Sequence, residues 1–319
     1  MRSYSWEPPI YYYTFGPHPP ALRVEPPCRI ETTTADAAGM DRYGQPIPPE
    51  KRHTEPGTEM KYSNPLTGPF YVEGAKPGDV VAVKIEEIAF TRDWAYSCFV
   101  PGFGALGAES TIAGATGLSL PLPDLRFVWK LDAKTGTGEI DLRWSRKRSL
   151  KIPLHPFLGC IGVAPKWGMR IASLAPGEHG GNMDCIETKP GTTIYLPVFV
   201  EGAYLFVGDC HAAQGDGECC GVALETTCRV ILTVGLISKK HIGTPRLEDG
   251  EFIMAVGSAR PLLDAYRISQ VEVIRWLVEE YGFEQWEAFQ VFSQVGRVRL
   301  GNVVDPNYSV VSKCPKAIL

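Results

Sequence analysis

The stretch Val81-Ala82-Val83-Lys84-Ile85-Glu86 alternates large apolar residues with small or charged ones. This is the two-residue period of a β-strand, whose successive side chains point to opposite faces of a sheet. Val81, Val83 and Ile85 would then form one apolar face that folding must bury. The preceding Lys76-Pro77-Gly78-Asp79 is typical of a turn. The pattern predicts a strand that follows a turn and covers a hydrophobic core.

Turn-forming residues occur throughout the rest of the chain. Among 319 residues, 33 are glycine and 27 are proline, and such frequent breaks favour many short strands joined by turns. Apolar segments predict further strands at Arg126–Leu131, Glu139–Trp144, Ile194–Val200, Ala203–Val207 and Val222–Ile237. The polar segment Asp132–Gly138 would join the first two of these strands as a hairpin loop.

Helical spacing of apolar residues occurs in the last part of the sequence. Ser269 and Glu272 have the spacing of a capping box, so we expect a helix that begins at Ser269 and ends at Gly282. Its inward face would consist of Val273, Ile274, Leu277, Val278 and Tyr281. A second helix is predicted at Glu284–Phe292, with Phe289 and Phe292 turned towards the core.

These elements predict a mainly β fold, similar to a β-sandwich with many short strands, and a smaller α+β part at the C-terminal end. The basic run Arg143–Lys151 is the candidate boundary between two parts. Residues 1–150 would form a β-rich N-terminal part. Residues 151–319 would hold further strands, the two helices and most of the polar motifs.

The composition argues against several classes of protein. A net charge of −4 gives no broad basic surface for nucleic acid. The longest uncharged run, Trp94–Ala108, is interrupted by proline and glycine, so it does not predict a membrane span. Glu7, Pro8 and Pro9 interrupt any apolar core of a signal peptide. We therefore expect a cytoplasmic protein that binds neither nucleic acid nor membranes.

The nine cysteines are an odd number and contain no Cys-x-x-Cys pair. Without an export signal, we interpret them as reduced thiols. Cys210 stands between Asp209 and His211, and a thiolate beside a histidine would be a strong nucleophile. Neighbouring side chains of a strand point to opposite faces, however, so we favour the interpretation of Cys210 as a small buried residue.

Two segments concentrate polar residues between glycines: Pro176–Asp184 and Gly208–Glu218. Asp209 and His211 are two residues apart and would point to the same side of an extended chain, and Asp216 and Glu218 have the same spacing. Asp, Glu and His side chains suit zinc or another divalent cation. The same residues could instead hydrogen-bond only their own turns, so the spacing alone leaves both interpretations open.

Three stretches together resemble the signature of the acetamidase/formamidase family: His155–Gly159, Gly180–Asp184 and Gly208–Glu218. Leu196–Val198 lies between the second and third stretches and Ala223–Glu225 follows the third, as in that family. The resemblance extends to Thr34 and Asp36 and to the C-terminal helices. It implies hydrolysis of a small linear amide, of the formamide or acetamide type, to a carboxylate and ammonia. It also implies a β-rich fold with an α/β part, a homo-oligomer that is often a dimer, and a metal ion.

The chemistry of amide hydrolysis assigns roles to the polar residues. A divalent cation, zinc being the candidate, can activate water and polarise the amide carbonyl. The candidate metal ligands are Asp184, Asp209, His211 and, as a weaker candidate, Asp216. The catalytic candidates are Glu218, as general base and then acid, together with His211, Asp209 and Asp184. The candidates for binding the substrate are Asn182, Gly181, His155 and Asp36. Glu225 would orient His211 or a ligand.

Two other functions stay open at this point. The same groups could hydrolyse another C–N bond, such as that of a γ-lactam. Pro101–Glu109 departs from the family's usual loop and leaves the identity of the amide undecided. The chain could also be a catalytically silent β-sandwich that binds a ligand.

Overall fold

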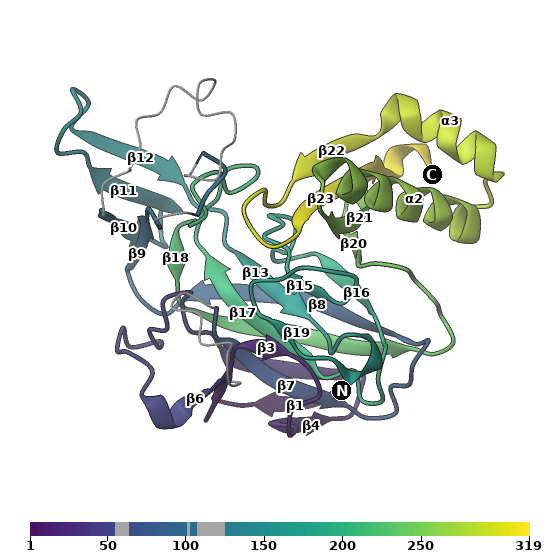
Figure 1. Cartoon of the computed structure of the whole chain (residues 1–319), viewed down its shortest axis with the longest axis horizontal. Coiled ribbons are helices and arrows are strands. Elements are labelled where there is room, and N and C mark those ends of the chain that lie inside the picture. Colours follow the sequence, from purple (N-terminus) through teal and green to yellow (C-terminus); the bar gives the residue numbers. More distant parts are fainter. Residues whose placement is uncertain (55–63, 101–102, 107–124) are drawn as a thin grey trace.

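The computed structural model describes residues 1–54, 64–100, 103–106 and 125–319, and the chain in Figure 1 is built mostly from β-strands. One sheet has nine strands, in the order β1 (Arg2–Ser5), β5 (Cys28–Thr33), β19 (Cys228–Ile237), β8 (Val80–Phe90), β16 (Thr193–Pro197), β20 (Arg246–Glu248), β21 (Phe252–Ala259), β23 (Tyr308–Pro315) and β22 (Arg297–Leu300). The mainly β fold predicted from the sequence is confirmed.

A second large sheet carries most of the polar motifs. Its main path runs β12 (Ser149–Pro153), β11 (Thr137–Asp141), β10 (Arg126–Asp132), β9 (Trp94–Cys98), β18 (Glu225–Thr226), β17 (Leu205–His211), β7 (Leu66–Val72), β2 (Tyr11–Tyr12) and β6 (Arg52–His53). Beside this path, β13 (Phe157–Gly162) pairs with β17 and with β15 (Gly180–Asn182), and β4 (Leu22–Val24) pairs with β7. A small sheet joins β14 (Ile171–Ala172) to β3 (Thr14–Phe15). Single 3-10 turns lie at Pro49–Lys51, Lys166–Gly168 and Lys316–Ile318.

The main core lies between the two large sheets. Val83 of β8 and Leu232 of β19 belong to the same apolar cluster as Leu158 of β13 and Val207 of β17. Along β8 the side chains of Val81, Val83 and Ile85 are fully buried, and those of Lys84 and Glu86 are exposed. The alternation in the sequence therefore places this strand correctly. Both sheets combine strands from residues 1–150 and 151–319, so the predicted division at residue 150 is not a division between sheets.

Two helices, α2 (Leu262–Tyr281) and α3 (Gln285–Val295), pack beside β21 and β23. A Cβ atom at Gly257 of β21 would lie 2.0 Å from the carbonyl oxygen of Ala265, so only glycine fits beneath α2. Among the described residues, no helix is long and apolar enough to cross a membrane.

The predicted start of the first helix is wrong. The helix begins at Leu262, and Ser269 and Glu272 both lie inside it with buried side chains. Ser269 hydrogen-bonds Ser312 of β23 (2.7 Å), and Glu272 pairs with the buried Arg246 (2.8 Å). The capping-box spacing thus reflects tertiary contacts. Gly282 does end the helix in the left-handed conformation, as predicted.

Three smaller expectations also change. Phe289 is 63% exposed, so it does not face the core, whereas Phe292 is buried as predicted. The predicted strand Val222–Ile237 is two strands, β18 and β19, which lie in different sheets. Glu139–Trp144 forms a strand only as far as Asp141, although the hairpin that joins it to β10 is confirmed.

The interpretation of all cysteines as reduced thiols is wrong for one pair. Cys210 of β17 and Cys228 of β19 form a disulfide, so they connect the two large sheets. Both side chains are fully buried, which agrees with the expected orientation of Cys210 away from His211. Their pairing depends on how the sheets face each other, which their separation in the sequence does not reveal.

Candidate active site

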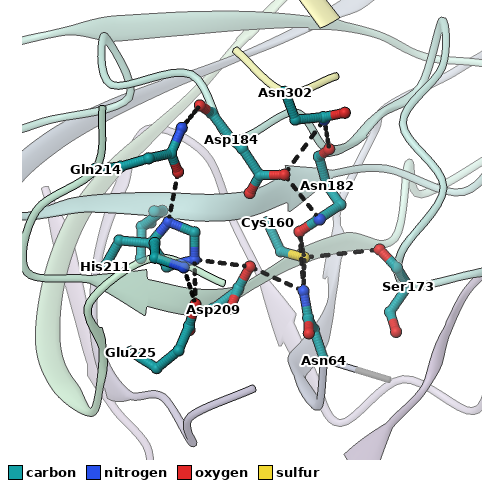
Figure 2. Close-up of polar contacts among 12 residues, drawn as sticks. Asn64, Cys160, Ser173, Asn182, Asp184, Asp209, His211, Gln214, Glu225 and Asn302 are labelled. Carbon is teal, nitrogen blue, oxygen red and sulfur yellow. Dashed lines mark hydrogen bonds and ion pairs between the residues drawn. The ribbon is translucent and has the colours of Figure 1, made fainter. Parts of the chain in front are cut away.

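The acidic and histidine side chains of the motifs meet at one side of β17, where β13, β15 and β18 also contribute. Figure 2 shows Asp209 and His211 pointing to the same side of the strand, towards Glu225 and Asp184. This confirms the orientation that their spacing predicts. His211 pairs across the ladder with Glu225 of β18, so the register of two strands places the second acid.

His211 is buried among carboxylates. Its Nε2 atom lies 3.2 Å from Asp209 Oδ2 and 3.4 Å from Glu225 Oε1, while its Nδ1 atom lies 2.9 Å from Gln214 Oε1. Burial alone would lower the pKa of the imidazole. The carboxylates of Glu225 and Asp209 outweigh this effect and raise the pKa well above its usual value. The site therefore favours a positive charge at Nε2, either a proton or a cation.

Asp184 approaches the same place from the loop after β15. Its Oδ2 atom accepts hydrogen bonds from Asn182 (2.9 Å) and Asn302 (3.3 Å), and its Oδ1 atom has no hydrogen-bond partner among the described residues. Burial and the charge of Asp209 raise the pKa of Asp184 to about 6, although His211 opposes the increase. A buried, half-satisfied carboxylate is costly unless something binds it.

Asn182 holds the acids in place. Its Nδ2 atom donates to Asp184 Oδ2 and to Asp305 Oδ2 (2.8 Å), and its Oδ1 atom accepts from Asn64 (3.0 Å) and from the Cys160 thiol (2.8 Å). Because both ends of the amide are engaged, the geometry favours a role in positioning carboxylates over direct contact with a substrate.

Gly159 leaves the space that two carboxylates occupy. A Cβ atom there would lie 2.5 Å from Asp209 Oδ2 and 2.6 Å from Asp184 Oδ1. The backbones of Asp184, Asp209 and Glu218 all have positive φ values, of 48°, 53° and 49°. Aspartate tolerates this region better than most residues, but it remains unusual and is typical of functional sites.

Two overlapping sets of side chains could hold a cation. Asp184, Asp209 and His211 form one set, and His211, Glu218 and Glu225 form the other; within each set the ligand atoms lie within 4.8 Å of one another. Several of these atoms are buried and lack a hydrogen-bond partner among the described residues: Asp184 Oδ1, Asp209 Oδ1, His211 Nε2 and Glu225 Oε2. One nitrogen and several carboxylate oxygens are a donor set that suits zinc, so these residues fit a divalent cation.

A cavity of about 440 Å³ opens onto the acids. Asp209, Glu218 and Glu225 line it together with an apolar wall formed by Phe99, Phe103, Leu174 and Val222. Burial, followed by the charge of Asp184, raises the pKa of Glu218 well above its usual value. Burial likewise raises the pKa of Glu225. A larger hollow of about 910 Å³ lies over β9, β10 and β11 and contains none of the predicted site residues.

The other predicted residues occupy different places. Asp216 is exposed and pairs with Arg299 (3.2 Å), and His155 is also exposed; both lie outside the acid cluster. Asp36 is buried and pairs with Arg92 (2.8 Å), next to Ala37 and Ala38 at the cavity wall. Gly181 is a buried member of β15.

Sequence reasoning missed several residues of the site: Asn64, Tyr96, Gln214 in its present role, Asn302 and Asp305. Asn302 and Asp305 belong to a short segment that follows Gly301, after the strand β22. Like the two selected motifs, this segment has Asn and Asp residues close to a glycine, and that pattern was the available signal. Part of Pro101–Glu109, which departs from the family's usual loop, lies outside the described residues.

Comparison with known proteins points to one family. The sequence profile of the Acetamidase/Formamidase family matches residues 166–319. The acetamidase of Mycolicibacterium smegmatis is 29% identical over 54% of this chain and 53% of its own length. The formamidase of Methylophilus methylotrophus is 29% identical over 56% of this chain and 52% of its own length. The chain thus spans about half the length of the curated relatives that it matches.

A solved structure gives a match over the whole fold. The crystal structure of acetamidase from Yersinia enterocolitica superposes with a TM-score of 0.83 at 38% identity, and the match covers 99% of this chain and 92% of the other. The described strands and helices are thus part of one shared architecture. The chain belongs to the acetamidase/formamidase family.

Proposed function

We propose that this chain is an amidase that hydrolyses a small linear amide, of the formamide or acetamide type, to a carboxylate and ammonia. One observation carries the proposal: His211 Nε2 and the acidic oxygens around it are buried, incompletely hydrogen-bonded and open to a cavity. Burying unpaired polar groups costs folding free energy, so such a site is not expected where the residues serve only to stabilise the fold. The same charged groups can stabilise the transition state of amide hydrolysis.

We further propose that Asp184, Asp209 and His211 hold a divalent cation, with zinc as the candidate. Their donor atoms lie within 4.8 Å of one another, and all three side chains are buried. When bound, such an ion supplies an activated water and polarises the amide carbonyl. Asp216, the weaker candidate from the sequence, pairs with Arg299 outside this cluster, so we leave it out of the ligand set.

Glu218 is the proposed proton carrier. It is buried and lines the cavity beside the acids, and burial together with the charge of Asp184 raises its pKa, which makes its carboxylate a stronger base than that of an exposed glutamate. It takes a proton from the attacking water, whose oxygen bonds to the acyl carbon. It then gives the proton to the departing nitrogen as the C–N bond breaks, and ammonia leaves.

Tyr96 and Asp36 are the proposed substrate-side residues. The Tyr96 hydroxyl accepts a hydrogen bond from the Ala38 backbone N–H (3.0 Å), which leaves its own proton to hold the amide oxygen in the cavity. Burial, with the charges of Asp36 and Glu225, raises the pKa of Tyr96 and keeps that proton on the hydroxyl. Asp36 thus acts from behind the cavity wall. Asn182 acts indirectly, because it positions the carboxylates of Asp184 and Asp305. Gly181 contributes as part of the backbone of β15.

We also propose a homodimer in the cytoplasm. Support for the dimer comes from apolar side chains that α2 and α3 expose: Leu263 (53%), Trp286 (70%) and Phe289 (63%). Sedimentation of the wild type and of a Trp286→Glu variant measures the association, and we expect the variant to sediment more slowly. An unchanged sedimentation coefficient would show that this surface does not form the dimer.

Cell fractionation tests whether the protein lies in the cytoplasm.

The deciding experiment measures ammonia release from formamide, acetamide and longer linear amides. A γ-lactam is tested in parallel, and its hydrolysis is measured as opening of the ring. The protein is shown to be folded and is supplied with zinc. We expect turnover of the short linear amides, and we expect Glu218→Gln and His211→Ala to abolish it. Asp216→Asn is the matched control and keeps its activity. Ring opening alone would replace the linear amide by a lactam, and no turnover of any compound would favour a silent ligand-binding protein.

A further inference from the structure

We propose that Gln214 is a positioning residue that decides which nitrogen of His211 faces the acids: it keeps a proton on Nδ1 and turns Nε2 towards Asp209 and Glu225. The consequence of this role for catalysis rests on the proposed function, but the effect of Gln214 on His211 does not. The side chain of Gln214 stands on the other side of the imidazole from Asp209 and Glu225, as Figure 2 shows.

The orientation of the Gln214 amide follows from its neighbours. Its Nε2 atom donates to the backbone carbonyl oxygens of Asp184 (2.9 Å) and Gly301 (3.0 Å). A carbonyl oxygen can only accept a hydrogen bond. If the amide were turned over, its oxygen would face two carbonyl oxygens and both would lose their donor. The network therefore places Oε1 towards His211.

This orientation fixes the proton on the histidine. Oε1 of Gln214 is only an acceptor, and it lies 2.9 Å from His211 Nδ1, so Nδ1 must carry the hydrogen. The other nitrogen, Nε2, then faces Asp209 Oδ2 and Glu225 Oε1. It presents either a lone pair to a bound cation or a second proton to the carboxylates. In both states the proton on Nδ1 stays.

Gln214 also connects three parts of the site. Its own loop follows β17, the Asp184 carbonyl belongs to the loop after β15, and the Gly301 carbonyl follows β22. The ring of His211 is therefore held on its outer side by groups that are anchored elsewhere. Partners that orient a ligating histidine in this way typically change metal affinity by about 10- to 100-fold when they are removed.

The direct test is ¹⁵N NMR of the histidine side chains, with zinc alone as the probe and with a metal-free sample for comparison. A His211→Gln variant identifies the signals of His211. In the wild type we expect Nδ1 to remain protonated in both samples and at every pH at which the protein stays folded. Nε2 alone should lose its proton or bind zinc. A bare Nδ1 beside a protonated or solvent-facing Nε2 would overturn the proposal without any variant of Gln214.

Two variants separate orientation from packing. Gln214→Met keeps the length but removes both hydrogen-bonding ends, so we expect mixed tautomers at His211 and zinc binding about 10- to 100-fold weaker. Gln214→Glu, when protonated, keeps one acceptor for Nδ1 and one donor, so it should restore the proton on Nδ1. Gln290→Met, at an exposed position of α3, is the control. Unchanged tautomer and zinc affinity in Gln214→Met would also reject the role.

The readouts keep this inference apart from the proposed function. If the protein hydrolyses no amide but Nδ1 of His211 is protonated and Gln214→Met mixes the tautomers, Gln214 has the proposed role in a site with another function. If amides are hydrolysed but Gln214→Met leaves His211 and zinc affinity unchanged, the amidase proposal stands and the role of Gln214 fails.

Discussion

Glu225 and His211 lie directly opposite each other in the pairing of β18 with β17, and their side chains meet at 3.4 Å between Oε1 and Nε2. Strand register thus fixes Glu225, and Asp209 lies on the same strand as His211, while Asp184 and Glu218 come from loops. Glu225 Oε1 also accepts the backbone N–H of Ala223 (2.9 Å), which limits its movement.

Removing the charge of Glu225 tests the importance of that pair. Glu225→Gln keeps the shape and an oxygen for the Ala223 N–H, but it lowers the negative charge beside His211. We expect kcat/KM for a short amide to fall by about 100-fold or more, which corresponds to about 3 kcal/mol of transition-state stabilisation. Steady-state kinetics measure the loss, and thermal unfolding of the same sample shows that the fold is retained. A variant with wild-type kinetics would exclude Glu225 from the site.

Gly159 is predicted to tolerate no side chain. In Gly159→Ala the new Cβ atom would meet the carboxylates of Asp184 and Asp209 at about 2.6 Å or less, and both are held by other contacts. We expect destabilisation of about 1–3 kcal/mol in urea unfolding and the loss of zinc binding. Gly250→Ala is the matched control, since no atom of the described residues lies within 4 Å of a Cβ atom there. Equal unfolding free energies and equal zinc binding in the two variants would contradict the close packing of the carboxylates against Gly159.

His179 should make stability depend on pH. Burial lowers its pKa from 6.5 to about 4, so the folded protein holds the neutral ring while the unfolded chain takes up a proton below pH 6.5. The contribution of His179 is therefore complete above about pH 6.5 and is lost as the pH falls towards 4, by about 3 kcal/mol in total.

The comparison that isolates this effect is His179→Gln against the wild type, by urea unfolding at several pH values. The buried acids with raised pKa values make the fold more stable as the pH falls, which opposes the effect of His179. Both the wild type and the variant contain these acids, so their effect cancels in the comparison. The difference in unfolding free energy should be constant above neutrality and shrink below pH 6.5. A difference that does not change with pH would mean that His179 is not buried in its neutral form.

The bond between Cys210 and Cys228 should be measurable in the unreduced protein. Mass spectrometry of the denatured chain should show one disulfide, and peptide mapping should assign it to these two residues. Its 18-residue separation predicts a stabilisation of about 3 kcal/mol, because the cross-link restricts the unfolded chain. The double variant Cys210→Ala, Cys228→Ala should lose about this amount. The single variant Cys28→Ala is the control for removing a buried thiol that forms no disulfide.

The sequence predicted those features that depend on local periodicity. Alternation gave the buried face of β8, and the two-residue spacing gave the common orientation of Asp209 and His211. Spacing failed where a polar residue serves a distant partner. Glu272 looks like part of a helix cap, but its partner is Arg246, 26 residues away.

The rest of the site depends on which strands become neighbours. Asn64 donates to Asp209 across 145 residues of chain, and Asn182 donates to Asp305 across 123. A single asparagine in a loop carries no periodic signal, so its role becomes visible only when the sheets are assembled. Asp216 shows the converse, because it has the same spacing to Glu218 as Asp209 has to His211 and yet turns outwards to Arg299.

These long connections have a consequence for how activity is gained during folding. Bringing the site residues together closes long loops of the chain, and each closure costs conformational entropy. Proteins whose contacts are mostly between residues far apart in the sequence fold slowly. No local fragment of the chain contains Asn64, Asp184, His211 and Asp305 together. Activity during refolding should therefore return with the last cooperative phase, which makes turnover a reporter of complete sheet assembly.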